Sequence, residues 1–375
     1  MKLTKQQLAF SLLCFLLLNC TLKTVSQTTL KEALAGKFLI GTAMNINQIW
    51  GKDTLAVKVI AQQFDAIVAE NCMKSMYLQP KEGEFNFKDA DRFVAFGEQN
   101  HLWMTGHCLI WHSQTPSWFF TDDQGKEVSK EVLIERMKNH ITTVVSRYKG
   151  RIKGWDVVNE ALNDDGTYRN SKFYEIVGED FIPLAFKFAH EADPDAELYY
   201  NDYNEWRPEK RDAIVKLIKK LKDEGLRIDA VGMQGHVGMD YPDLGDYKAA
   251  IDAYAAAGVK VMLTELDLSA LPSPRRNVGA NISDIEAYRN EMNPYTGDLP
   301  DSVATAWTNR MAALFKLFID NRDKMERVTL WGVTDGQSWK NDFPMRGRTD
   351  YPLLFDRNYQ PKTIVSTIIQ EAEKQ

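Results

Sequence analysis

The feature that most constrains the fold is a regular alternation of short apolar segments with longer segments of helical periodicity. Short apolar runs rich in β-branched residues are typical of parallel strands that are buried on both faces. The expected strands are Phe38–Ala43, Asn71–Tyr77, Leu102–Trp111, Ile152–Glu160, Glu197–Asn201, Ile228–His236, Val259–Leu266 and Arg327–Val333. The expected helices are Leu55–Glu70, Ala90–Asn100, Lys130–Tyr148, Phe173–Glu191, Pro208–Glu224, Tyr247–Ala257, Val303–Asn321 and Lys362–Glu373. Eight strands, each followed by a helix, predict the α/β class and a single (β/α)8 TIM barrel.

Length and composition fit one such barrel. The chain has 375 residues, of which 44% are hydrophobic and 26% charged, so a sizeable core is available. The formal net charge of −6 gives no indication of a nucleic-acid partner or of binding to an anionic membrane surface. The 9 Trp and 14 Tyr side chains suit core packing or sugar stacking, and composition alone leaves both interpretations open.

The first 20 residues have the pattern of an export signal. Lys2 and Lys5 precede an almost wholly apolar run that is too short for a membrane span, so residues 1–19 are expected to be a secretory signal peptide. The run ends in LLNC, which resembles a bacterial lipoprotein box with Cys20 as the lipidated residue. Asn19 departs from the small residue usual before that cysteine, so lipidation and ordinary cleavage a few residues later both stay open. The protein is therefore expected to be exported, as a periplasmic or outer-membrane lipoprotein in a bacterium or otherwise as a secreted protein.

Residues 20–29 are expected to be a short tether, and residues 30–375 the barrel. A long loop from Ser269 to about Pro300 contains several prolines and is expected to be irregular. Cys72 and Cys108 lie in apolar runs at a spacing that forms no disulfide framework, so both are expected to be buried free thiols. No paired Cys/His spacing predicts a zinc site.

Polar side chains cluster where the expected strands end. Strand four ends in Asn159 and Glu160, strand five in Asn201 to Tyr203, and strand seven around Glu265 and Asp267. The other strand ends contribute Glu70, Asn71, Lys74, His107, Trp111, His112, Gln114, Gln234, His236, Trp331, Asp335 and Trp339. Each of these taken alone has a structural explanation, but in this fold all strand ends meet at one face, where active sites are built. The joint pattern therefore predicts a site in which two carboxyl groups face one substrate.

Six sequence blocks also carry a family resemblance. They are GHCLIWHSQTPSW at 106–118, WDVVNEAL at 155–162, YYNDYN at 199–204, GMQGHV at 232–237, TELDL at 264–268 and WGVTDGQSW at 331–339. In this order and spacing they resemble the signature blocks of the family 10 glycoside hydrolases, the retaining endo-β-1,4-xylanases, over about residues 30–372. Ser75, at a position expected inside strand two, departs from the usual Trp of the family, and the loop at 275–298 matches no family pattern.

The resemblance implies a role for each matching residue. Glu160 matches the acid/base and Glu265 the nucleophile, two carboxyl groups that lie about 5–5.5 Å apart in retaining enzymes. His236 matches the residue that hydrogen-bonds the nucleophile, Asp267 the one that holds this histidine, and Asn159 the donor to the sugar 2-hydroxyl. The substrate-binding residues that the resemblance implies are Glu70, Asn71, Lys74, His107, Trp111, Gln114, Gln234, Trp331 and Trp339, with Gln114 and Trp339 closing the space that a glucose hydroxymethyl group would need.

The expected activity is therefore hydrolysis of internal β-1,4-xylosidic bonds by a two-glutamate double displacement, with xylan and xylo-oligosaccharides as ligands. This mechanism needs no metal or cofactor, and no protein partner is expected. Two alternatives stay open. One is a different β-1,4-glycanase on the same barrel, a cellulase or a mannanase, and the other is a non-catalytic glycan-binding lipoprotein.

Overall fold

The computed structural model describes residues 28–272, 290–295 and 297–374. The expected signal peptide, Cys20 and most of the tether lie outside the described residues, as does most of the loop at 275–298. The strands of the barrel wall are β1 (Leu39–Met44), β2 (Ala66–Ala69), β3 (Trp103–Trp111), β4 (Gly154–Asn159), β5 (Glu197–Asp202), β6 (Ala230–Met233), β8 (Lys260–Ser269) and β9 (Met325–Leu330).

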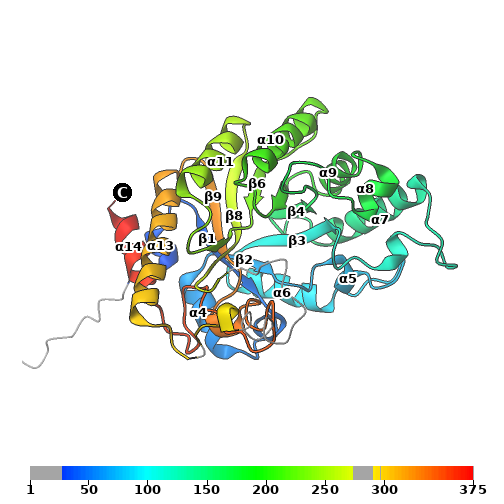
Figure 1. Ribbon diagram of the computed structural model, residues 1–375. Helices are drawn as coiled ribbons and strands as arrows, with labels where there is room; N and C mark the ends of the chain where they lie inside the picture. The colour runs from blue at the N-terminus through cyan, green and yellow to red at the C-terminus, as the bar shows by residue number, and fades with distance from the viewer. Residues whose placement is uncertain (1–27, 273–289, 296, 375) are drawn as a thin grey trace, which may run out of the picture.

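The strands form a closed parallel barrel, as the alternation predicted (Figure 1). Strands β1 to β6 pair in chain order, β6 pairs with β8, β8 with β9, and β9 with β1, which closes the ring. In the closing pair Leu39 lies opposite Arg327. A short additional strand, β7 (His236–Gly238), pairs with the end of β8 and places His236 opposite Asp267. The pairing therefore brings the C-terminal ends of all these strands to one face.

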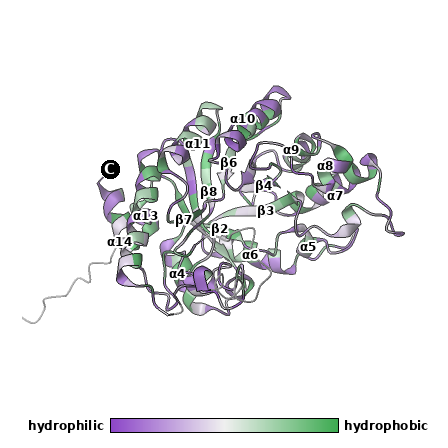
Figure 2. Cartoon of the chain, in the orientation of Figure 1, coloured by the Kyte–Doolittle hydropathy of each residue, from purple (hydrophilic) through white to green (hydrophobic). Residues whose placement is uncertain are grey.

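Helices surround the barrel (Figure 1), and each has buried residues that pack against the strands or against neighbouring helices. They are α2 (Leu30–Ala33), α3 (Ile46–Ile49), α4 (Thr54–Gln63), α5 (Ser75–Leu78), α6 (Lys88–Gln99), α7 (Lys130–Arg147), α8 (Lys172–Val177), α9 (Phe181–Ala192), α10 (Pro208–Asp223), α11 (Leu244–Ala256), α13 (Asp301–Asp320) and α14 (Thr363–Glu373), with short 3-10 turns η1 (Ser117–Phe119) and η2 (Asp335–Gln337). In α6 the buried residues include Ala90, Phe93, Val94 and Gly97, the helical spacing of a single stripe. Figure 2 shows the same division, with hydrophilic and hydrophobic residues alternating along the outer helices.

Strand two lies earlier in the chain than the sequence predicted. It is Ala66–Ala69 rather than residues 71–77, and α4 ends at Gln63 rather than at Glu70. Asp65 separates the two elements, and its Oδ1 accepts a hydrogen bond of 2.8 Å from the backbone N–H of Ile40 in β1. β2 has only four residues and all of them are buried, so it shows no alternation of buried and exposed positions. Its apolar residues were therefore predicted as a continuation of the helix before it.

Ser75 consequently lies at the start of α5 and not inside a strand. Its side chain is buried, and its Oγ lies 3.3 Å from the carbonyl oxygen of Leu109 and 3.4 Å from Nε2 of His140. A small hydroxyl at this position therefore fills a polar space between α5, β3 and α7, where the family usually has Trp.

Two other predicted elements are interrupted by glycines. The expected sixth strand divides into β6 and β7 around Gly235, which has φ +79°. The expected helix at 173–191 divides into α8 and α9, because Gly178 (φ +78°) ends α8. Such left-handed backbone favours glycine and cannot continue a strand or a helix. The seventh strand is longer than predicted, because β8 runs to Ser269.

Cys72 and Cys108 are buried free thiols, as predicted. Across residues 28–272, 290–295 and 297–374, no helix is long and apolar enough to span a membrane.

Candidate active site

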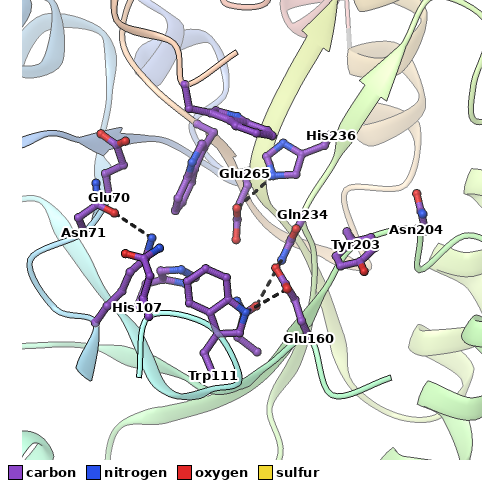
Figure 3. Close-up of a pocket in the computed structure, with 15 residues that line it drawn as sticks. Glu70, Asn71, His107, Trp111, Glu160, Tyr203, Asn204, Gln234, His236 and Glu265 are labelled. Atoms are coloured by element: carbon purple, nitrogen blue, oxygen red, sulfur yellow. Dashed lines mark hydrogen bonds and ion pairs between the residues drawn. The ribbon is translucent and has the colours of Figure 1, made fainter. Parts of the chain in front are cut away.

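The C-terminal ends of the barrel strands surround a cavity of about 460 Å³ (Figure 3). The sequence-predicted residues that line it are Glu70, Asn71, Lys74, His107, Trp111, Gln114, Asn159, Glu160, Gln234, His236, Glu265, Trp331 and Trp339. Among the residues to which the resemblance gave a role, Asp267 alone does not line it, because it is completely buried behind His236. Tyr203 and Asn204 also line the cavity. The structure thus brings together residues that lie as far apart in the chain as Glu70 and Trp339.

Glu265 lies in β8 with its carboxylate almost completely buried at the cavity wall. Its Oε1 accepts a hydrogen bond of 2.9 Å from Nδ2 of Asn201, and its Oε2 lies 3.2 Å from Nε2 of His236, as Figure 3 shows for the His236 contact. Burial alone would raise the pKa of Glu265, but the hydrogen bond from His236 and the neighbouring positive charge outweigh it. The pKa therefore falls below its ordinary value, and Glu265 is an anion at neutral pH.

His236 lies between two carboxylates. Its Nε2 faces Glu265, and its Nδ1 lies 3.0 Å from Oδ1 of Asp267. Burial disfavours the imidazolium, but Asp267 and then Glu265 raise the pKa of His236 to about 9. Burial would raise the pKa of Asp267, but the charges of His236 and Lys340 hold it below its ordinary value. At neutral pH His236 is therefore a cation between two anions.

Glu160 follows the last residue of β4 and has a different environment. Its side chain is 15% exposed, and its oxygens accept hydrogen bonds of 3.0 Å from Nε2 of Gln234 and 3.0 Å from Nε1 of Trp111. His112 lies 3.9 Å away, and burial, with the charge of Arg169, lowers the pKa of His112 to about 4, so that this ring is neutral. The backbone of Glu160 is left-handed, with φ 56°.

The contrast between the two carboxyl groups is chemical. Glu265 accepts from a cation, whereas the donors to Glu160 are a neutral amide and a neutral indole. A pair of carboxyl groups on one cavity, of which only one accepts from a cation, is the arrangement that double-displacement hydrolysis uses.

The opposite side of the cavity carries a second set of polar and charged side chains (Figure 3). Nζ of Lys74 donates to Oδ1 of Asn71 at 3.0 Å and lies over the Trp111 ring at 5.0 Å. Burial raises the pKa of Glu70. His107 is buried, with its Nδ1 2.8 Å from Oδ2 of Asp156 one strand away. These groups present charged and neutral hydrogen-bonding atoms side by side at the ends of β2 and β3.

Two tryptophans form an aromatic wall. Trp331 is nearly buried, and its ring meets His107 edge to face at 5.4 Å. Trp339 is 36% exposed, and its ring lies between His236 at 5.2 Å and Phe343 at 5.1 Å. Nε1 of Trp339 donates to Oδ2 of Asp267 at 2.8 Å. The position of this ring is therefore fixed from three sides.

Asn201 has a place at the end of strand five in the sequence but no predicted role. Asn201 is completely buried and joins β5 to β8, since Oγ1 of Thr264 donates to Oδ1 of Asn201 at 2.6 Å while Nδ2 of Asn201 donates to Glu265. Gly232 makes room for it: a Cβ atom there would lie 2.4 Å from Oδ1 of Asn201 and 2.7 Å from Cγ2 of Thr264.

Arg169 and Tyr203 were also missed as a pair. Nε of Arg169 donates to the carbonyl oxygen of Glu160 at 2.9 Å, and its Nη2 donates to the Tyr203 hydroxyl at 2.6 Å. Nζ of the buried Lys210 lies 4.0 Å from the centre of the Tyr203 ring. Tyr203 had a signal in its place after strand five, but Arg169 lies in the turn after β4, where no periodic pattern identifies it.

Among the described residues, no group of three or more His, Cys, Asp or Glu side chains is placed to hold a metal ion.

Comparisons with known proteins identify the family. The model of glycosyl hydrolase family 10 matches residues 29–371. The chain is 53% identical over 345 residues to endo-1,4-beta-xylanase A of Xylanibacter ruminicola, covering 92% of this chain and 94% of that protein. It is also similar to the structure of a GH10 endoxylanase from a sugarcane soil metagenome, with 42% identity, a TM-score of 0.86, and coverage of 92% of this chain and 100% of that one. A further similar structure, a mutant in complex with xylotriose, has 34% identity, a TM-score of 0.81, and coverage of 91% of this chain and 99% of that one. The protein whose strand ends carry these two carboxyl groups thus belongs to glycosyl hydrolase family 10.

Proposed function

We propose that this protein is an endo-β-1,4-xylanase that hydrolyses internal bonds of xylan with retention of anomeric configuration. The observation that carries the proposal is the different environment of Glu160 and Glu265 on one cavity, because only Glu265 is paired with a cationic histidine. The xylanase relative from Xylanibacter ruminicola and the similar structure with xylotriose support xylan and xylo-oligosaccharides as the substrate class.

In the first step, an oxygen of Glu265 attacks the anomeric carbon while the bond from that carbon to the leaving oxygen breaks. Glu160 gives its proton to the leaving oxygen, so that the departing sugar leaves as a neutral alcohol. In the second step, Glu160 takes a proton from water, and the water oxygen attacks the anomeric carbon and releases Glu265. Two inversions at one carbon give net retention.

The remaining cavity residues bind and orient the sugar. Asn159 contacts Asn201 and Gln234 at 3.0 and 3.3 Å and lines the same cavity as both glutamates, which suits a donor to the sugar 2-hydroxyl. Glu70, Asn71, Lys74, His107 and Gln114 are the hydroxyl-binding groups, with Trp111, Trp331 and Trp339 as apolar walls and Gln234 as support for Glu160. His236 and Asp267 keep Glu265 ionised and aimed, because a charge-assisted donor favours the anion.

Reducing-sugar assays on xylan, cellulose and mannan test the substrate. We expect hydrolysis of xylan and almost none of the other two. Comparable rates on cellulose or mannan would favour another β-1,4-glycanase, and no hydrolysis of any of the three would favour a glycan-binding protein.

The mechanism has its own test. Proton NMR of the first product from an aryl xylobioside should show the β-anomer, and Glu265→Gln should remove nearly all activity. An α-anomer as first product would exclude the retaining mechanism.

We further propose that the protein is exported by the signal in residues 1–19 and begins at Cys20 with lipid, or a few residues later without it. The support is the charged start, the apolar run and the LLNC sequence. Palmitate labelling of the wild type that is lost in Cys20→Ala would establish the lipid, whereas labelling that survives this change would exclude Cys20 as its site.

A further inference from the structure

The carboxylate of Asp267 contacts three nitrogen groups, two of them in ion pairs and one through a hydrogen bond. Its Oδ1 lies 3.0 Å from Nδ1 of His236 and 3.3 Å from Nζ of Lys340, and its Oδ2 accepts from Nε1 of Trp339 at 2.8 Å. One buried anion thus contacts the histidine that holds the nucleophile, the aromatic wall, and a lysine that the mechanism has not used.

Lys340 has no direct access to substrate in this arrangement. It does not line the cavity, and its side chain is only 13% exposed. Its Nζ lies 4.9 Å from the centre of the ring of Trp339, its neighbour in the chain. A lysine ammonium that is largely removed from water is unfavourable unless an anion compensates it, and the anion here is Asp267.

The four groups form a row of alternating charge. Glu265 is negative, His236 positive, Asp267 negative and Lys340 positive, with successive contacts of 3.2, 3.0 and 3.3 Å. Without Lys340, the row would carry an uncompensated negative charge in a buried place. Within the row, His236 would then be the one cation left to pair with both Glu265 and Asp267. Trp339 would donate its hydrogen bond to an Asp267 carboxylate that has lost one of its partners.

We propose that Lys340 is a positioning residue that acts through Asp267, keeping this carboxylate ionised and shared between His236 and Trp339. The ionisation of the nucleophile and the position of the aromatic wall are thereby set by the same buried anion. The proposal rests on the proposed xylanase function for its kinetic consequences, but its electrostatic consequence for His236 does not depend on substrate.

Other titratable groups also lie around the row. Those that face Glu265, His236 or Asp267 from neighbouring elements include His107 of β3, Glu205 after β5 and Glu160 after β4. Replacing Lys340 therefore removes the positive charge next to Asp267 and leaves the carboxyl groups and imidazoles of the cavity in place.

The test compares Lys340→Met, which removes the charge and keeps an apolar stem, with Lys340→Arg, which keeps the charge. Lys324→Met is the matched control, since Nζ of Lys324 forms a 2.7 Å ion pair with Asp252 at the opposite end of the barrel. The first readout is the NMR titration of His236 with ¹⁵N-labelled imidazole in the unliganded protein. Loss of a nearby positive charge should raise the midpoint of His236 by roughly 0.5–1 pH unit in Lys340→Met.

The second readout is the pH dependence of kcat/KM on an aryl xylobioside. Because Lys340 also favours the anion of Glu265, its loss should move the acid limb of the profile upward, by roughly 0.5–1 pH unit. The ratio of kcat/KM for aryl xylobioside to that for aryl cellobioside should fall roughly 3- to 10-fold, as the wall loses a fixed position. Lys340→Arg should keep the acid limb of kcat/KM, the ratio between the two aryl glycosides and the titration midpoint of His236 close to their wild-type values. Lys324→Met should leave all three unchanged.

The outcomes separate this proposal from the proposed function. A wild type inactive on xylosides would overturn the function, and the His236 midpoint in Lys340→Met would still decide on Lys340. If that midpoint and the acid limb both stay at their wild-type values while only the melting temperature falls, Lys340 is merely structural and the proposal is wrong.

Discussion

Adding one methyl group at Gly232 should disable Glu265, the proposed nucleophile, without touching it. The new Cβ in Gly232→Ala would lie 2.4 Å from Oδ1 of Asn201 and 2.7 Å from Cγ2 of Thr264, which is closer than side chains can approach. Asn201 is completely buried and has no free space to move into, so its amide must turn away from β6. The 2.9 Å hydrogen bond from Asn201 to Glu265 is then lost.

The magnitude follows from the kind of bond. A hydrogen bond to a charged group contributes about 1.5–3 kcal/mol, so its loss should lower kcat roughly 10- to 150-fold. Overpacking a buried position typically lowers the free energy of unfolding by about 1–3 kcal/mol. The acid limb of kcat/KM should also move upward, because the bond from Asn201 lowers the pKa of Glu265.

The assay is kcat on an aryl xylobioside, with the melting temperature measured alongside. Asn201→Ala and the double variant complete a cycle, and the double variant should be no slower than the slower single one, since both changes remove the same bond. Gly41→Ala is the control: its Cβ would lie 2.8 Å from Oγ1 of Thr329, away from the cavity, so it should lower the melting temperature and keep kcat. The reasoning is refuted if Gly232→Ala keeps wild-type kcat, or if the two single effects multiply.

Three further results are expected. Glu160→Ala should retain activity on substrates with very good leaving groups in the first step, which need no acid, and added azide should accelerate it by replacing water; absence of azide rescue would contradict the acid/base role. Trp339→Ala should lower kcat/KM for aryl xylobioside roughly 5- to 100-fold and more than for aryl cellobioside, so an equal loss on both would show that the wall does not select xylose. The stability that His236 gains from its two carboxylates should be complete below about pH 6.5 and disappear as pH rises through about 9, the raised pKa. The difference in melting temperature between wild type and His236→Gln should therefore shrink from pH 6 to pH 9.5, and a difference that grows over this range would refute the ion pairing.

The fold and most of the cavity were predictable because both depend on local patterns. The strands that carry Glu160 and Glu265 are apolar runs of ordinary length that end in polar residues, so the barrel topology alone brings their ends together. β2 was misplaced because its four buried residues have no period that distinguishes them from the helix before them. The misplacement of β2 did not affect the prediction of Glu70 and Asn71 as site residues, because these two residues directly follow the last residue of the true strand.

The contacts that cross the barrel could not be predicted in the same way. Asn201 meets Glu265 across β6, and that contact depends on the absent side chain of Gly232, for which the sequence has no periodic or compositional signal. Lys340 pairs with Asp267 because a loop after β9 folds back over β8. Such pairings depend on distances between elements, which a sequence pattern does not contain.

The left-handed backbone at Glu160 sets catalysis against stability in this fold. An L-residue with a side chain of this size prefers other backbone regions by roughly 1–2 kcal/mol, and here that preference is overridden at φ 56° to bring the carboxyl group into the cavity. Glycine would accept the same backbone without penalty. Backbone strain alone would therefore favour glycine over Glu160, and a protein with that change would lack the proposed acid. Glu160, the proposed acid/base residue, is thus a position that stabilising redesign of this barrel should exclude from mutation.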